Sequence, residues 1–316
     1  MYVQLVSATR SPISTLLSAW QISRSKHSPL LPAYIDLYRS SVVRSEEFLN
    51  SEHKFTHPDL SIVDGKLLIM GQPIEELLNQ IFNSNLPVTE TVQFTFCFED
   101  VPVAFREQAV RSTQGTSFWL QTSRITDFSE FATKGEYYIP PELMSNPQAL
   151  AKYRESMKRI QDMYNELVAM GVNTDHARAI MPYYRTERGN YTYNLRALIA
   201  IIRQRSCWIA SSFWTDIVAQ IMKILLAEDP LFALISTPPC CDSKGKYKAC
   251  PYSVDMDKRI KGTDPLELCP IYVKSELATT MSAIRDKSAA EISRQRYEQF
   301  YKNLWAGVAS SELVLE

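Results

Sequence analysis

The stretch that decides the fold runs from Thr192 to Arg205 and reads TYNLRALIAIIRQR. Its apolar residues recur at helical spacing, and we predict a helix over residues 194–204. Arg196 and Arg203 lie seven residues apart in the sequence, which is about two helical turns, so they share one face of this helix. Arg205 falls where the helix should end, and it is therefore free to turn into a cleft.

Two segments upstream carry further arginines. Residues 177–182 read ARAIMP and place Arg178 on a short helix that we predict over residues 175–181, ended by Pro182. Residues 108–124 read QAVRSTQGTSFWLQTSR. A single arginine on a helix is most often solvated or in a surface ion pair of little energetic value. Several guanidinium groups close together repel one another, however, so a cluster of them calls for an anion.

The glycine content excludes the common phosphate-binding loops. The chain has nine glycines, and no two are closer than six residues. The G-x-G-x-x-G fingerprint and the P-loop both need closely spaced glycines to bring backbone N–H groups to phosphate, so both are absent. If this protein binds a nucleotide, side chains must hold the phosphate, and arginine is the residue whose planar fork matches phosphate oxygens.

Length and composition bound the remaining possibilities. The chain has 316 residues, 45% apolar and 22% charged, which fits one large or two modest globular domains. A formal charge of −1 gives no electrostatic reason to expect a nucleic-acid or membrane-surface partner. We see no apolar run long enough to span a bilayer and no secretory signal. Six cysteines do not suggest a secreted disulfide framework, so we expect a cytoplasmic protein.

Periodicity predicts most of the other elements. Residues 92–98 alternate apolar and polar side chains, which is typical of a half-buried strand. We expect residues 1–45 to be largely helical, residues 46–75 to be irregular with a short hairpin over 67–70, and residues 111–135 to be loop with some extended structure. Further helices are predicted over residues 74–82, 103–110, 149–170 and 213–227.

Composition shifts near residue 236, where we place a domain boundary. Residues 237–271 are rich in proline and contain four of the six cysteines, namely Cys240, Cys241, Cys250 and Cys269. Four thiolates could hold zinc, but no C-x-x-C spacing is present, so free thiols are the simpler interpretation and we assign no metal. Residues 274–308 are predicted to form an amphipathic helix that docks on the core or on a neighbouring subunit.

The arginine segments together resemble the flavin-dependent thymidylate synthases, the ThyX family. The resemblance covers roughly residues 1–236 and is strongest over 171–235. The matching positions are Phe94-Thr95-Phe96, Gln108, Arg111, Tyr137-Tyr138-Ile139-Pro140, Ala177-Arg178, Met181-Pro182, Thr192, Asn194, Arg196 and Arg205.

The resemblance implies an α+β fold with a central, mostly antiparallel sheet flanked by helices. Residues 1–236 would be the catalytic domain, and residues 237–316 a C-terminal extension. The implied reaction transfers a one-carbon unit from methylenetetrahydrofolate to C5 of a pyrimidine deoxynucleoside monophosphate, most simply dUMP to dTMP. FAD is the implied cofactor, NADPH the reductant, and a homotetramer with active sites at subunit interfaces the implied assembly.

Site roles follow from the resemblance, position by position. Arg111, Asn194 and Arg196 match flavin-contacting positions. The matches to nucleotide-binding positions are Gln108, Thr122, Arg124 and Arg178, with the arginines at the phosphate. Arg205 matches the arginine at the pyrimidine edge, where its charge would favour negative charge on the ring as C5 becomes nucleophilic. The resemblance implies no cysteine nucleophile, because the flavin carries the one-carbon unit and the hydride.

The sequence departs from the family on the flavin and folate side. The family's Arg-His-Arg motif reads Arg111-Ser112-Thr113, and Ile125 replaces its tyrosine. The acidic residue in the family's loop has no counterpart, and either Leu120 or Gln121 takes its place. Two alternatives therefore stay open. One is a related enzyme that makes a modified pyrimidine nucleotide, C5-hydroxymethylated or methylated, from dUMP or dCMP. The other is a non-catalytic nucleotide-binding homologue.

Overall fold

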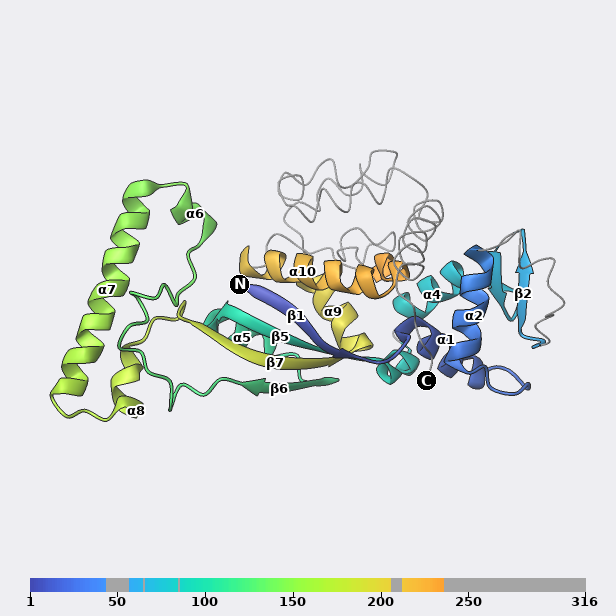
Figure 1. Ribbon diagram of the computed structural model, residues 1–316, viewed down its shortest axis with the longest axis horizontal. Coiled ribbons are helices and arrows are strands. Elements are labelled where there is room, and N and C mark those ends of the chain that lie inside the picture. The colour runs from blue at the N-terminus through green and yellow to red at the C-terminus, as the bar shows by residue number, and fades with distance from the viewer. Residues whose placement is uncertain (44–56, 65, 85, 206–211, 236–316) are drawn as a thin grey trace, which may run out of the picture.

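A computed structural model describes residues 1–43, 57–64, 66–84, 86–205 and 212–235 (Figure 1). The helices and strands in chain order are β1 (Tyr2–Ala8), α1 (Pro12–Ile22), α2 (Pro32–Val43), β2 (Leu60–Val63), β3 (Lys66–Ile69), β4 (Gln72–Pro73), α4 (Ile74–Asn83), η1 (Pro87–Thr91), β5 (Gln93–Pro102), α5 (Val103–Ala109), β6 (Thr116–Leu120), α6 (Pro141–Met144), α7 (Pro147–Ala169), α8 (Thr174–Ala177), η2 (Arg178–Ile180), β7 (Thr186–Asn194), α9 (Leu195–Arg205), α10 (Ser212–Glu228) and η3 (Pro230–Ile235).

The centre of the molecule is a four-stranded sheet in the order β1-β5-β7-β6, with every pair antiparallel. Strand β5 has one fully buried face. Its Phe94, Phe96 and Phe98 are fully buried, whereas the residues that alternate with them are not. The three rings belong to the same buried core as apolar residues of α9 and α10, the helices that lie along the sheet in Figure 1. The fold is therefore α+β with an antiparallel sheet flanked by helices, as expected.

Two further parts extend from the sheet (Figure 1). At one end α1, α2 and α4 lie with a second, smaller sheet in the order β2-β3-β4. At the other end the long helix α7 packs over its own small core, whose buried members are Phe128, Phe131, Met157, Tyr164, Ala177 and Met181. In the described part of the chain, no helix combines the length and apolar character needed to cross a membrane.

Most predicted elements are confirmed, and two differ. The predicted helices correspond to α4, α5, α7, α9 and α10, and the predicted strand to β5. Residues 2–8, however, form an edge strand and not a helix, because β1 pairs with β5 and places Val3 opposite Phe98. Residues 60–63, 66–69 and 72–73 form three short strands where only a hairpin over residues 67–70 was predicted. In both places long-range pairing overrides a weak local pattern.

The predicted boundary near residue 236 falls at the edge of the described residues. The cysteines Cys240, Cys241, Cys250 and Cys269 and the predicted helix over residues 274–308 lie outside them. Those predictions therefore stay predictions.

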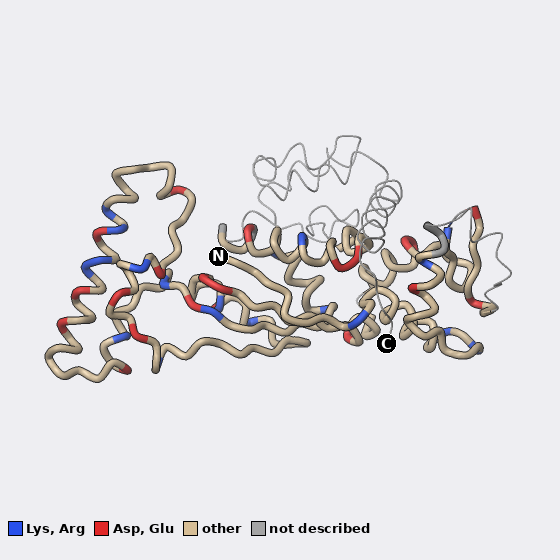
Figure 2. Tube along the Cα trace, viewed as in Figure 1, with Lys and Arg blue, Asp and Glu red and all other residues tan. Residues whose placement is uncertain are grey.

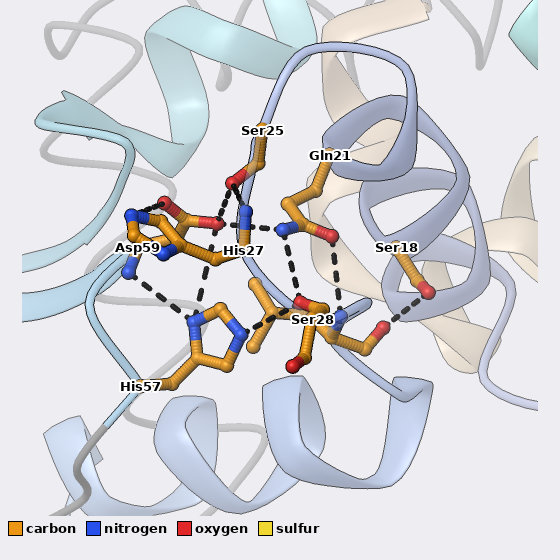
Figure 3. Close-up of polar contacts among 8 residues, drawn as sticks. Ser18, Gln21, Ser25, His27, Ser28, His57 and Asp59 are labelled. Carbon is orange, nitrogen blue, oxygen red and sulfur yellow. Dashed lines mark hydrogen bonds and ion pairs between the residues drawn. The ribbon is translucent and has the colours of Figure 1, made fainter.

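A buried carboxylate holds the N-terminal part together (Figure 3). The Asp59 side chain is 8% exposed and accepts hydrogen bonds from Gln21 Nε2 at 2.6 Å and Ser25 Oγ at 2.5 Å. The rings of His27 and His57 each approach its carboxylate to 4.0 Å. Burial raises the pKa of Asp59, but the two hydrogen bonds and the histidines outweigh burial and hold that pKa below its usual value. Asp59 thus ties α1 and the loop after it to the start of β2.

Replacing Asp59 by asparagine is expected to lower the free energy of unfolding by about 1–3 kcal/mol at pH 7, because two buried donors lose a charged acceptor. A depressed carboxyl pKa contributes stability above the unfolded-state pKa, which is about 4, and that contribution is lost as pH falls through the folded-state value. The wild type should therefore lose more stability than Asp59→Asn as the pH falls below about 4. Urea unfolding across this range tests the difference, with the exposed Asp162→Asn as control; equal pH slopes would contradict it.

Candidate functional site

Two of the arginines expected at the phosphate, Arg124 and Arg178, converge on one carboxylate. Arg178 Nη2 lies 2.5 Å and Arg124 Nε lies 3.5 Å from the same oxygen, Asp175 Oδ1. Arg178 also donates from Nε to the Asp175 carbonyl oxygen at 3.0 Å and from Nη1 to the Ser123 hydroxyl at 2.7 Å. The structure thus brings these two arginines together. We call the residues Thr122, Ser123, Arg124, Asp175 and Arg178 the Asp175 cluster.

Short local structures position the residues of the Asp175 cluster. Asn173 caps α8 by accepting a hydrogen bond from the Asp175 N–H at 2.8 Å, and the side chains of Asp175 and Arg178 then face each other three residues apart. On the loop after β6, the Thr122 hydroxyl accepts from the Arg124 N–H at 3.3 Å. Thr122 therefore supports the loop that presents Arg124, and its own hydroxyl faces the same loop.

A groove of about 630 Å³ borders the Asp175 cluster. Its lining residues are Trp119, Leu120, Gln121, Thr122, Ile125, Thr126 and Arg188. Trp119 and Ile125 are 82% and 87% exposed, which is unusual for such large apolar side chains. The groove therefore offers apolar surface beside the cationic side chain of Arg188, and Thr122 belongs both to its lining and to the Asp175 cluster.

Arg205 lies in a second place, between α9 and α10. Its guanidinium group lies over the Trp214 ring, 4.9 Å from the ring centroid, and the Trp214 Nε1–H donates to Gln108 Oε1 at 2.8 Å. Trp214 is buried and also contacts Phe105 of α5 with ring centroids 4.5 Å apart. Burial, and then the nearby positive charge of Arg111, lower the pKa of Arg205. The structure thus joins Arg205 and Gln108 through Trp214, which the sequence does not single out, and brings the charge of Arg111 close to Arg205.

The remaining two predicted residues lie at the start of α9. The Asn194 Oδ1 accepts a hydrogen bond from the Ala197 N–H at 2.9 Å, which caps the first turn of the helix. The Asn194 N–H donates to the Gly115 carbonyl oxygen at 2.7 Å. Arg196, the second residue of α9, forms an ion pair with Glu90 at 2.6 Å. Arg203, on the same face of α9 as predicted, bonds to the end of α4 through Asn83 at 2.6 Å.

Gly115 is expected to tolerate no side chain. Its φ is +71°, and a Cβ at this position would collide with the side-chain amide of Asn194. Gly115→Ala should therefore lower the free energy of unfolding by about 2–3 kcal/mol, through the left-handed backbone and the displaced cap of α9. Thermal unfolding measures the loss. Gly171→Ala is the matched control, since it shares a positive φ, +88°, but a Cβ there meets nothing. If the two variants lost equal stability, the collision would carry no cost.

The single chain does not bring all the predicted residues to one point. Gly115 and Asn194 lie at one end of β6, and Thr122 and Arg124 follow its other end. Five strand residues separate these ends by about 15 Å. Arg205 contacts Trp214 of α10, whereas Arg178 contacts the loop after β6. One chain thus supplies separate parts of the predicted site.

Charged side chains are spread along the described part of the chain, and metal-binding side chains do not cluster there. Figure 2 shows acidic and basic residues interspersed along the described trace, in line with the balanced composition. Among the residues that the structure describes, no three histidine, cysteine, aspartate or glutamate side chains gather in a way that could hold a metal ion. Arginine, amide and hydroxyl groups therefore dominate the candidate site.

Comparison with known proteins identifies the family of the chain. A family model described as "thymidylate synthase complementing protein", Thy1, matches residues 5–231. A flavin-dependent thymidylate synthase of Nitratidesulfovibrio vulgaris is 31% identical over 127 residues, 37% of this chain and 49% of the relative. One of Thermococcus onnurineus is 26% identical over 120 residues, 38% of this chain and 49% of the relative. The chain spans about half the length of these curated relatives. Because the family model covers most of its residues, the chain belongs to the thymidylate synthase complementing protein family.

Proposed function

We propose that residues 1–236 catalyse one-carbon transfer to C5 of a pyrimidine deoxynucleoside monophosphate, most simply dUMP to dTMP. The single observation that carries the proposal is the pairing of Arg124 and Arg178 beside the Thr122 and Ser123 hydroxyls. Two guanidinium groups and neighbouring hydroxyls are the donors that a phosphate monoester needs in a chain without glycine-rich loops. The names of the curated relatives, flavin-dependent thymidylate synthases, support the same choice.

The base end of the site belongs to Arg205. Its side chain is held in place by stacking on Trp214, which Gln108 in turn orients through the indole N–H. Arginine stays protonated at neutral pH even where burial lowers its pKa. A fixed cation at the pyrimidine edge stabilises negative charge that builds on the ring when C5 becomes nucleophilic. Arg205 therefore acts electrostatically, and it needs no proton transfer.

The residues assigned to flavin fit an anionic dinucleotide. The Arg111 side chain is exposed, so its fork is available to a diphosphate. The Asn194 Oδ1 is engaged by the helix cap, which leaves its Nδ2–H₂ as a donor. Arg196 reaches the same region but is paired with Glu90. Bound FAD would supply hydride and one-carbon carrier chemistry at this place.

The balance of atoms defines the co-substrates. The methylene unit of methylenetetrahydrofolate forms a bond to C5 of the pyrimidine, which loses its proton, and becomes a methyl group by gaining a hydride. Its two bonds to the folate nitrogens break, and these nitrogens take up two protons, equivalent to the one lost from C5 and one from solvent, so that tetrahydrofolate leaves. NADPH is the hydride source that we propose. No cysteine is needed as nucleophile in this scheme, and Cys97, the one described cysteine, lies on strand β5 with a pKa raised by burial.

Assembly follows from the separation within one chain. Since Asn194 and Arg124 lie at opposite ends of β6, we propose that a neighbouring copy supplies the complementary half of each site, in a homotetramer. The exposed Trp119 and Ile125 next to the Asp175 cluster are consistent with such a contact between copies. The composition favours the cytoplasm as its compartment.

The test is a spectrum and a product analysis of the purified full chain. We expect a yellow protein with flavin absorption between roughly 350 and 500 nm. It should convert dUMP to dTMP with methylenetetrahydrofolate and NADPH, as read by mass spectrometry. A colourless protein that takes up no added FAD would overturn the flavin half of the proposal.

A second candidate rests on the altered motif. Ser112 and Thr113 stand beside Arg111 where the family has charge, so hydroxyl groups replace cationic donors near the proposed flavin. This change favours altered C5 chemistry, such as hydroxymethylation or methylation of dCMP. The same product analysis with dCMP distinguishes the two enzymes. Binding of dUMP without flavin or turnover would instead identify a non-catalytic homologue.

A further inference from the structure

In the Asp175 cluster, both arginines already contact a carboxylate of this chain. Asp175 Oδ1 contacts both Arg178 and Arg124, at 2.5 Å and 3.5 Å. That oxygen is fully shielded from solvent, although the Asp175 side chain as a whole is 31% exposed. A carboxylate presents its oxygens to guanidinium forks much as a phosphate does. Asp175 therefore already supplies one negative charge to the two guanidinium groups that we assign to the nucleotide phosphate.

The arrangement is built by the fold and does not depend on one flexible contact. Asp175 and Arg178 are joined by the α8 turn, whereas Arg124 comes from the loop after β6. Ser123 from the same loop accepts from Arg178 at 2.7 Å, so loop and turn are joined twice. The next cation, Arg185, lies over the Phe128 ring at 5.7 Å and in the field of Glu187. Two guanidinium groups and one carboxylate thus carry a net charge of +1.

We propose that Asp175 is an internal counter-ion that determines how many phosphates the site accepts. The proposal rests on the proposed function, which places the nucleotide phosphate at Arg124 and Arg178. In the free protein, Asp175 keeps the two cations together. With nucleotide bound, it stays close to the phosphate and repels it. A single phosphate ester still finds a favourable net charge, but each added phosphate brings negative charge that one excess cation cannot neutralise.

The physical consequence is selectivity for the monophosphate over the di- and triphosphate. Repulsion between like charges a few ångströms apart is partly screened at a surface but still changes affinity several-fold. Asparagine at position 175 keeps the size and the oxygen acceptor and removes the charge. It should therefore strengthen binding of every phosphorylated ligand, and most of all binding of the triphosphate.

The experiment measures the Kd of dUMP, dUTP and deoxyuridine by calorimetry on the full chain with FAD added. For Asp175→Asn we expect dUMP to bind about 5-fold tighter and the preference for dUMP over dUTP to shrink roughly 10-fold. Deoxyuridine should bind equally to both proteins. Asp175→Glu, which keeps the charge, should retain the wild-type preference. Asp162→Asn, a carboxylate paired with Lys158 on α7, is the matched control and should change none of these values.

Other results would overturn the inference. If Asp175→Asn bound dUMP more weakly, or left the dUMP-to-dUTP preference unchanged, Asp175 would be only a support for the arginines. If the wild type bound no uridine nucleotide, the proposed function would fail, and inorganic pyrophosphate would then serve as the probe. Tighter binding of pyrophosphate by Asp175→Asn than by the wild type would preserve the counter-ion role of Asp175 without the nucleotide. Equal binding by the two proteins would overturn that role as well.

Discussion

Replacing Arg39 by methionine is expected to lower the free energy of unfolding by about 3–5 kcal/mol. Arg39 of α2 pairs with Asp229 at the end of α10 at 2.5 Å, and the two side chains are only 4% and 6% exposed. Methionine fills the space but leaves the Asp229 carboxylate buried without its cation. Since a typical domain has about 5–15 kcal/mol in total, the variant should be close to unfolding.

A second substitution separates charge from packing. Adding Asp229→Asn to Arg39→Met removes the stranded carboxylate and keeps the Oδ1 that accepts from the Leu231 N–H at 3.0 Å. The double variant should therefore be more stable than Arg39→Met alone. Urea unfolding of the set measures the coupling. Lys158→Met, which breaks the exposed pair with Asp162, should cost less than about 1 kcal/mol. A similar loss from both single variants would show that burial of the Arg39 pair is unimportant.

Replacing Arg205 by lysine is expected to lower kcat by about 10²–10³-fold with little change in the Kd of dUMP. Lysine keeps the positive charge but lacks the planar group that stacks on Trp214 at 4.9 Å, so the charge is no longer held at the pyrimidine edge. Because the charge matters most once negative charge has built up on the ring, turnover should fall far more than binding. Single-turnover assays with dUMP, together with calorimetry, measure the two separately.

The control for this variant lies two residues away on the same helix. Arg203→Lys changes an arginine that bonds to Asn83 and the Phe82 carbonyl oxygen of α4, away from Trp214. It should leave kcat within a few-fold of wild type. If Arg205→Lys behaved like Arg203→Lys, Arg205 would not act on the transition state. If it lost dUMP binding and turnover equally, its role would be ordinary substrate binding.

Local pattern predicted the elements whose apolar residues repeat at a regular interval. Phe94, Phe96 and Phe98 alternate, and they form the buried face of β5. The apolar positions of residues 195–205 recur at helical spacing, and they form α9. The edge strand β1 was missed, because its backbone hydrogen bonds come from β5, some ninety residues away along the chain. Pairing of that kind leaves only a weak trace in the local sequence.

Within the candidate site, residue type could be inferred but partnership could not. The spacing of Arg178, Asn194 and Arg205 was sufficient to indicate the family and the kinds of group it uses. Asp175 stands three residues before Arg178, so its contact was open to prediction from helical spacing alone. The contact between Arg205 and Trp214 was not, since it joins two helices whose relative position depends on core packing.

The amino-acid order thus establishes an arginine-based, glycine-poor site on an α+β scaffold, because side-chain chemistry and periodicity are properties of the chain itself. The three-dimensional fold alone decides that Arg124 and Arg178 meet at Asp175, that Arg205 stacks on Trp214, and that Asn194 lies at the far end of β6. Except for the local pair of Asp175 and Arg178, these contacts join separate elements, and their geometry is set by the burial of apolar side chains between strands and helices, which no local pattern encodes.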